Sequence, residues 1–221
     1  MTARLVDLTQ PIHEGMPTFP VPHHPIVEIT QLARHGIENR ETRKVILGTH
    51  TGTHLDAPRH YIPGGATVEE IALETLIGPA SICDLRHKSD QAIQISDLEP
   101  LLKGKPTERV LFYTGWTDHY GKWDYFRGHP YLSVEAGRWL MDEGCRLLGM
   151  DCPQMDHPSH SRHHDPDSPI HYLLLGAGVV MVENMCRLDQ LLEHRFDLMV
   201  LPLPITGGDG SPVRAIARVM E

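Results

Sequence analysis

Cysteine and aromatic residues are scarce in this 221-residue sequence, which has four cysteines and only 6% Phe, Trp and Tyr. The cysteines are widely spread, and no two of them form a C-x-x-C pair: Cys83, Cys145, Cys152 and Cys186. This spacing excludes a zinc ribbon and gives no sign of a disulfide scaffold. We therefore expect reduced, mostly buried thiols in a cytoplasmic protein.

An excess of basic charge and long apolar runs are also lacking. Twenty Lys and Arg residues stand against 29 Asp and Glu residues, and the formal net charge is −9. Nucleic-acid binding needs a clustered basic surface, so we expect a small-molecule substrate and no nucleic-acid partner. No run reaches the roughly 18 apolar residues that a membrane span requires. Residues 1–10 do not resemble a signal peptide either, so we expect no membrane association.

The length fits one domain, which we place at residues 1–221. Six β-rich runs between turn signals predict strands: Arg43–Leu47, Ala80–Leu85, Val110–Thr114, Leu147–Met150, Val179–Val182 and Leu198–Leu201. Capping residues and apolar spacing predict helices at Thr67–Leu76 and Ser133–Glu143. Strands that alternate with helices indicate the α/β class with a mixed sheet.

Histidine, by contrast, is abundant, with sixteen residues against four phenylalanines. His50, His54 and Asp56 occupy even positions, so an extended backbone would turn their side chains to the same side. Gly52 lies between them and allows a bend that tightens their convergence. Two imidazoles and a carboxylate suit zinc and, with open positions, manganese or ferrous iron. On spacing alone, two alternative interpretations stay open: polar residues on an exposed strand, or a buried pair of hydrogen-bonded histidines.

His60 follows at the same parity, just beyond Pro58. An imidazole has an unperturbed pKa of about 6.5 and therefore both accepts and donates protons near neutral pH. We expect His60 to be the catalytic residue that moves a proton.

A second candidate pair lies far along the chain. Glu183 ends an apolar β-branched run, where a buried carboxylate needs a cationic partner. His171 stands twelve residues earlier, in a short helix that Gly176 and Gly178 are expected to end. Taken alone, His171 is equally well interpreted as a surface residue.

Several motifs together resemble one family. They are Asp7-Leu-Thr-Gln-Pro-Ile, Gly15-Met-Pro, H-x-G-T-H-x-D-x-P-x-H from His50 to His60, Thr114-Gly-Trp116, Gly149-Met-Asp151, His171 with Glu183-Asn184, and Gly210-Ser-Pro-Val-Arg214. Over nearly its whole length the sequence resembles the cyclase family of metal-dependent hydrolases, which includes bacterial kynurenine formamidase and isatin hydrolase.

The resemblance implies a swivelling β/β/α fold, in which a barrel-like mixed β core is flanked by helices. It also implies two divalent ions, zinc or manganese. One ion would be held by His50, His54 and Asp56, and the other by Asp56, His171 and Glu183, with Asp56 bridging them. A homodimer or higher homo-oligomer is implied as well.

The implied activity is hydrolysis of a C–N amide-type bond. Arylformamidase activity comes first, converting N-formylkynurenine to kynurenine and formate in tryptophan catabolism. Hydroxide generated at the metals would attack the carbonyl while His60 carries the proton to the leaving nitrogen. Phe19 and Trp116 are expected to form aromatic walls of the substrate pocket, with ordinary core packing as the alternative for both.

Some features depart from the family pattern. Phe19-Pro-Val-Pro22 stands in place of Pro-Gly-Asp-Pro, and Gln154 replaces the serine of Gly-Ile-Asp-x-x-Ser-x-Asp. A Pro- and His-rich stretch at 151–169, which contains His157–His164, predicts a long functional loop. The stretch Gly207–Gly210 is interpreted as a turn.

Two alternatives therefore stay open beside arylformamide hydrolysis. One keeps the site and changes the substrate to a cyclic amide such as isatin, or to a carbamate. The other is a metal- or ligand-binding protein that performs no turnover.

Overall fold

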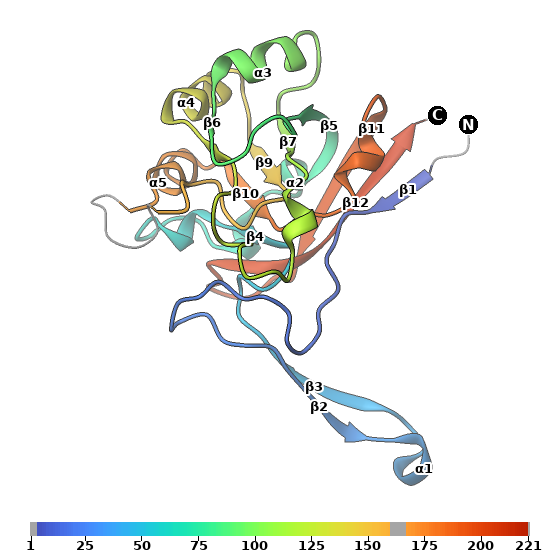
Figure 1. The fold of residues 1–221 in the computed structure, drawn as a ribbon. Helices are drawn as coiled ribbons and strands as arrows, with labels where there is room; N and C mark the ends of the chain where they lie inside the picture. Colours follow the sequence, from blue (N-terminus) through green and yellow to red (C-terminus); the bar gives the residue numbers. More distant parts are fainter. Residues whose placement is uncertain (1–3, 160–166, 221) are drawn as a thin grey trace.

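Eight strands form a mixed sheet that curls into a barrel-like core (Figure 1). The computed structural model describes residues 4–159 and 167–220. The strand order is β1-β12-β11-β5-β7-β9-β10-β4, and an additional pairing of β12 with β4 closes the ring. The bounds are β1 Arg4–Asp7, β4 His54–Asp56, β5 Ile77–Asp84, β7 Arg109–Tyr113, β9 Leu147–Met150, β10 Val180–Glu183, β11 Arg195–Pro202 and β12 Gly210–Met220.

Three helices lie along one side of this core (Figure 1): α3 Ile95–Leu102, α4 Val134–Asp142 and α5 Pro169–Gly176. Several short elements connect these parts. They are α2 Leu73–Leu76, the two-residue strands β6 Ala92–Ile93 and β8 Tyr131–Leu132, and 3-10 turns at Pro58–His60, Val68–Glu70, Trp116–His119 and Leu188–Leu191. Within residues 4–159 and 167–220, no helix has the length and apolar character needed to cross a membrane.

Side chains alternate between two cores. On β7, Leu111 points into the barrel, whereas Val110 and Phe112 pack toward the helices. On β10, Val182 faces the barrel interior and Met181 faces the helices. Strands that are buried on both faces consist of nearly continuous apolar residues. These strands therefore appear in the sequence as uninterrupted β-rich segments. Burial of each such side chain contributes on the order of 1.5–3 kcal/mol.

A hairpin of β2 Glu28–Ala33 and β3 Thr42–Ile46 extends away from the barrel and carries α1 His35–Glu38 at its tip (Figure 1). Leu32, Ile37 and Val45 are exposed on it, and Ile37 keeps 70% of its surface in solvent. An isolated two-stranded hairpin is marginally stable in water. This arm carries apolar surface that the other described residues do not cover.

The predicted α/β class with a barrel-like mixed sheet is confirmed. All six predicted strands occur, Leu147–Met150 with the predicted bounds and the other five with bounds shifted by one to three residues. The helix predicted from Ser133 is present, and Ser133 Oγ accepts a hydrogen bond from the N–H of Ala136 at 3.1 Å. The helix predicted at Thr67–Leu76 is wrong in its continuity. Its capping box forms, but extended backbone at Ile71 and Ala72 separates a 3-10 turn from α2.

Candidate functional site

The site begins on the ladder between β4 and β10. Its register places Glu183 opposite His54 and Val182 opposite Leu55. Leu55 and Val182 point into the barrel. Because successive side chains on a strand alternate, His54, Asp56 and Glu183 turn to the opposite face, on which α5 packs. All three are buried.

His50 reaches this face through a turn. Gly52 has a φ of +63°, a conformation that favours glycine, and its carbonyl accepts a hydrogen bond from Nδ1 of His54 at 2.9 Å. Gly210 of β12 pairs with Asp56, and a Cβ there would lie 2.8 Å from Cε1 of His50. The bend expected at Gly52 is present, but His50 lies in a turn and not in extended backbone: β4 orients His54 and Asp56, and the turn delivers His50.

His171 comes from the first turn of α5. The carboxylate of Asp156 accepts hydrogen bonds from the backbone N–H groups of Ile170 at 2.8 Å and of His171 at 3.1 Å, and also bonds Nδ1 of His171. With Nδ1 engaged, Nε2 of His171 faces Asp56 Oδ2 at 3.6 Å and Glu183 Oε1 at 3.4 Å. The surface interpretation of His171 is thus excluded by its burial.

These side chains form two groups, and within each the possible ligand atoms all lie within 4.8 Å of one another. One group is His50, His54 and Asp56, and the other is Asp56, His171 and Glu183. On the first side, Oδ1 of Asp56 lies 2.6 Å from Nδ1 of His50 and 3.3 Å from Nε2 of His54. The fold thus brings together the five residues that the family resemblance implies as metal ligands.

The charges at this point favour a cation. Burial raises the pKa of Glu183, and the nearby carboxylate of Asp56 adds to the rise. Burial also acts to raise the pKa of Asp56, but His50 and His54 outweigh it and hold that pKa well below its usual value. Oε1 of Glu183 has no hydrogen-bond partner among the described residues. Two buried carboxylates with an unbonded oxygen and imidazole nitrogens beside them fit a divalent metal such as zinc or manganese.

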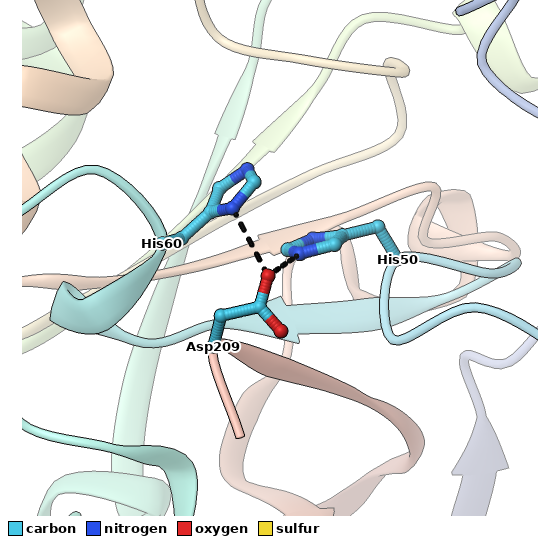
Figure 2. A group of neighbouring side chains, drawn as sticks. All are labelled: His50, His60 and Asp209. Carbon is cyan, nitrogen blue, oxygen red and sulfur yellow. Dashed lines mark hydrogen bonds and ion pairs between the residues drawn. The ribbon is translucent and has the colours of Figure 1, made fainter. Parts of the chain in front are cut away.

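Asp209 adds a carboxylate on the other side of His50. Its Oδ2 lies 2.8 Å from Nε2 of His50 and 3.3 Å from Nδ1 of His60, and the two imidazole rings are 3.9 Å apart between centroids (Figure 2). Hydrogen bonds from His50 and His60 lower the pKa of Asp209. Burial acts to lower the pKa of His50, but Asp56 and Asp209 outweigh it and raise that pKa to about 10.

The sequence analysis did not single out Asp209, since it interpreted the segment only as a turn. The turn is present, and the N–H of Ala57 donates to the backbone carbonyl of Asp209 at 2.9 Å. This bond lies beside the β12–β4 pairing, which brings together residues more than 150 positions apart, such as Gly210 and Asp56. No local pattern could have indicated that contact.

A cavity of about 160 Å³ opens over the two groups. Phe19, Tyr61 and Phe126 line it, and the rings of Phe19 and Phe126 meet edge to face at 5.4 Å. The ring of Tyr61 lies 4.7 Å from that of His171. Phe19 is therefore at the cavity, where the sequence analysis expected it.

Trp116 lies elsewhere, and its prediction as a pocket wall is corrected. Its ring stacks on that of His119 with 4.1 Å between the centroids, and its Nε1–H donates a hydrogen bond to the carbonyl of Tyr125 at 2.8 Å. It belongs to the core between the sheet and the helices. Of the His-rich segment, residues 160–166 lie outside the described residues, and His157 packs its ring against Tyr131 at 4.5 Å.

A family model described as "Putative cyclase" matches residues 6–157. The chain belongs to this family. Kynurenine formamidase of Bacillus mycoides (strain KBAB4) is 31% identical over 219 residues, which cover 98% of each chain. Kynurenine formamidase of Bacillus cytotoxicus (strain DSM 22905 / CIP 110041 / 391-98 / NVH 391-98) is 33% identical over 216 residues, 96% of each chain.

Three solved structures that are described as hydrolases share the fold. Isatin hydrolase A from Labrenzia aggregata superposes with a TM-score of 0.89 at 28% identity, covering 99% of this chain and 94% of that one. Isatin hydrolase A from Ralstonia solanacearum superposes with a TM-score of 0.85 at 28% identity, covering 99% of this chain and 92% of that one. A structure described as a predicted metal-dependent hydrolase from Bacillus stearothermophilus superposes with a TM-score of 0.79 at 28% identity, covering 99% of each chain. The chain is a hydrolase of the cyclase family, as predicted, and the alternative without turnover is set aside.

Proposed function

We propose that the protein is an arylformamidase that converts N-formylkynurenine to kynurenine and formate, a step of tryptophan catabolism. Relatives named kynurenine formamidase, which align with nearly the whole chain, support this substrate. The observation that carries the proposal is the shared carboxylate of Asp56. Its Oδ1 lies 2.6 Å from Nδ1 of His50 and its Oδ2 lies 3.6 Å from Nε2 of His171, beneath a cavity with aromatic walls.

Two sets of side chains would each hold one zinc or manganese ion: His50, His54 and Asp56, and Asp56, His171 and Glu183. A pair of divalent ions, when bound, lowers the pKa of a water molecule and polarises the substrate carbonyl. The chain prepares its ligands by engaging their second nitrogens. Nδ1 of His54 is hydrogen-bonded to the carbonyl of Gly52, and Nδ1 of His171 is hydrogen-bonded to the carboxylate of Asp156. Nε2 of each histidine therefore faces the carboxylates of Asp56 and Glu183.

His60 is the proposed proton carrier. It lines the cavity, and its Nδ1 faces Oδ2 of Asp209, which leaves Nε2 for exchange with the reactants. In this role it accepts a proton from the attacking water and donates it to the amide nitrogen as the C–N bond breaks. The products are a free arylamine and formate.

The cavity suits a flat ring on the amide nitrogen. Phe19, Phe126 and Tyr61 offer aromatic faces and edges around it. Aromatic pairs of this kind contribute about 0.5–1.5 kcal/mol beyond the apolar area they bury. The small formyl group would then lie toward the carboxylates.

A cyclic amide is the second candidate substrate. It is favoured by the TM-score of 0.89 to isatin hydrolase A from Labrenzia aggregata. Opening the lactam ring of isatin breaks the same kind of aryl C–N amide bond and needs the same proton transfer by His60.

The test is hydrolysis of N-formylkynurenine beside isatin, with metal content measured on the same sample. We expect faster turnover of N-formylkynurenine. Replacement of His60 by alanine should lower kcat by 10²-fold or more, the usual range for loss of a general acid or base, and should leave the bound metal in place. His87→Ala, at an exposed histidine, is the matched control. Full turnover by the His60→Ala variant would remove the role assigned to His60.

The remaining proposals concern the assembly and its location. We propose a homo-oligomer, most simply a homodimer, supported by the uncovered apolar residues of the β2–β3 hairpin. We propose a cytoplasmic location, supported by four free and buried cysteines. One domain over residues 1–221 is supported by a sheet whose strands span Arg4 to Met220.

A further inference from the structure

Gln154 lies in the wall of the cavity and is only 5% exposed. Its Nε2 is buried and has no hydrogen-bond partner among residues 4–159 and 167–220. Buried amide N–H groups in folded proteins are nearly always bonded, because an unmade bond destabilises the fold. A donor of this kind, on a residue that lines a cavity, needs an acceptor that the described part of the protein does not supply.

The backbone on either side of this glutamine is tied to three different elements. The carbonyl of Cys152 accepts from the N–H of Asn184, and that of Met155 accepts from the N–H of Leu132, each at 2.9 Å. Asp156 caps α5 through two backbone N–H groups. The amide is therefore held at the cavity by a rigid segment, next to the proposed metal centre.

The surroundings restrict the acceptor. The amide of Gln154 is uncharged, so a neutral acceptor satisfies it without the burial of a further ion. Phe19 and Phe126 supply apolar walls that suit a flat ring. A neutral oxygen attached to an aryl ring matches both conditions.

We propose that Gln154 donates a hydrogen bond from Nε2 to the oxygen of a carbonyl group. This carbonyl group is attached to the aromatic ring at the position ortho to the nitrogen. N-formylkynurenine and isatin both carry a carbonyl at that position. Gln154 thus selects ortho-acyl anilides over plain anilides. This inference rests on the proposed function and specifies its substrate class.

The experiment compares two formamides that differ only in the ortho-acetyl group that supplies this carbonyl, 2-formamidoacetophenone and formanilide. We expect the metal-loaded protein to prefer the ketone in kcat/KM. Gln154→Met keeps the length of the side chain and removes the donor, and it should reduce this preference by about tenfold, the effect expected of one well-placed hydrogen bond. Gln91→Met, at an exposed glutamine, should retain the full preference. An unchanged ratio in the Gln154→Met variant would overturn the inference.

A binding measurement separates this inference from the proposed function. The dissociation constants of 2-aminoacetophenone and aniline are measured for the parent and for Gln154→Met. A preference for the ketone that falls about tenfold in the variant supports the role of Gln154 even if neither formamide is hydrolysed, a result that would refute only the arylformamidase proposal. Equal binding of both amines by the parent would refute the role of Gln154. Thermal unfolding midpoints at or above that of the parent would show that the variant is folded, since the substitution removes a buried unbonded donor.

Discussion

The carboxylate of Asp209 and the imidazole of His60 face each other, with Oδ2 3.3 Å from Nδ1 (Figure 2). The same oxygen lies 2.8 Å from Nε2 of His50. One carboxylate thus orients both the proposed proton carrier and a proposed metal ligand. Such outer partners fix which nitrogen of an imidazole is free to act.

The first prediction concerns this carboxylate. Asp209→Asn should lower kcat for formamide hydrolysis by about 10–100-fold, the usual cost of losing a partner that orients a metal ligand. KM should change by less than about threefold, since Asp209 does not line the main cavity. Steady-state kinetics on the metal-loaded protein would measure both. Asp142→Asn on α4 serves as control, and a normal kcat for the Asp209→Asn variant would show that the contact has no part in the reaction.

The second prediction concerns metal removal. A chelator should abolish activity, and zinc or manganese should restore it, because two buried carboxylates at the site need positive charge. Elemental analysis should find about two ions per chain in the parent protein, as expected for a shared-carboxylate pair. Glu183→Gln should lose one of them.

The control for this measurement is Glu193→Gln, at an exposed glutamate, which should keep the metal content of the parent. If Glu183→Gln also kept it, Glu183 would not be a ligand.

The third prediction concerns acid stability. His129 is fully buried with its Nδ1–H donating to the carbonyl of Pro130, and burial lowers its pKa to about 4. Because this value lies below that of the unfolded chain, the unfolded state takes up a proton first as the pH falls. The contribution of neutral His129 to stability is fully present above about pH 6.5 and is lost progressively toward pH 4. The free energy of unfolding should fall by about 2 kcal/mol between pH 7 and pH 5.

Urea unfolding at pH 7 and pH 5 would measure this effect. His129→Gln should show a smaller loss of unfolding free energy on acidification than the parent, whereas His87→Gln should behave like the parent. Equal losses in all three proteins would mean that His129 does not contribute.

The fourth prediction concerns the hairpin. Ile37→Asp and Val45→Glu should reduce the size of the assembly, because both residues expose apolar surface on an arm that residues 4–159 and 167–220 leave uncovered. Light scattering coupled to size-exclusion chromatography would report the mass. Gln31→Glu adds a charge at an exposed polar position of the same hairpin and should leave the mass unaltered. A monomeric parent protein would refute the proposed oligomer directly.

Sequence reasoning reached some elements and not others. The runs around Leu111 and Val182 are buried on both faces and therefore consist of consecutive apolar residues. The sequence predicts such runs as strands even when their partner strands are unknown. β12 was missed although Val213, Ala215 and Ala217 alternate with less buried residues, a signal that the glycine, serine and proline at its start obscured. Trp116 was assigned to the pocket on residue type alone, and its position depended on packing that residue type does not encode.

The sequence by itself indicated which donors could bind a metal, because two imidazoles and a carboxylate stand close together in His50–Asp56, and the family resemblance added His171 and Glu183. The sequence also determined the fold class, through the apolar periodicity of strands and helices. Only the tertiary structure decided which distant groups meet these donors. Asp156, Asp209 and Gln154 take their roles from a helix cap, a strand pairing and a cavity wall, and each is a contact between segments far apart in the chain.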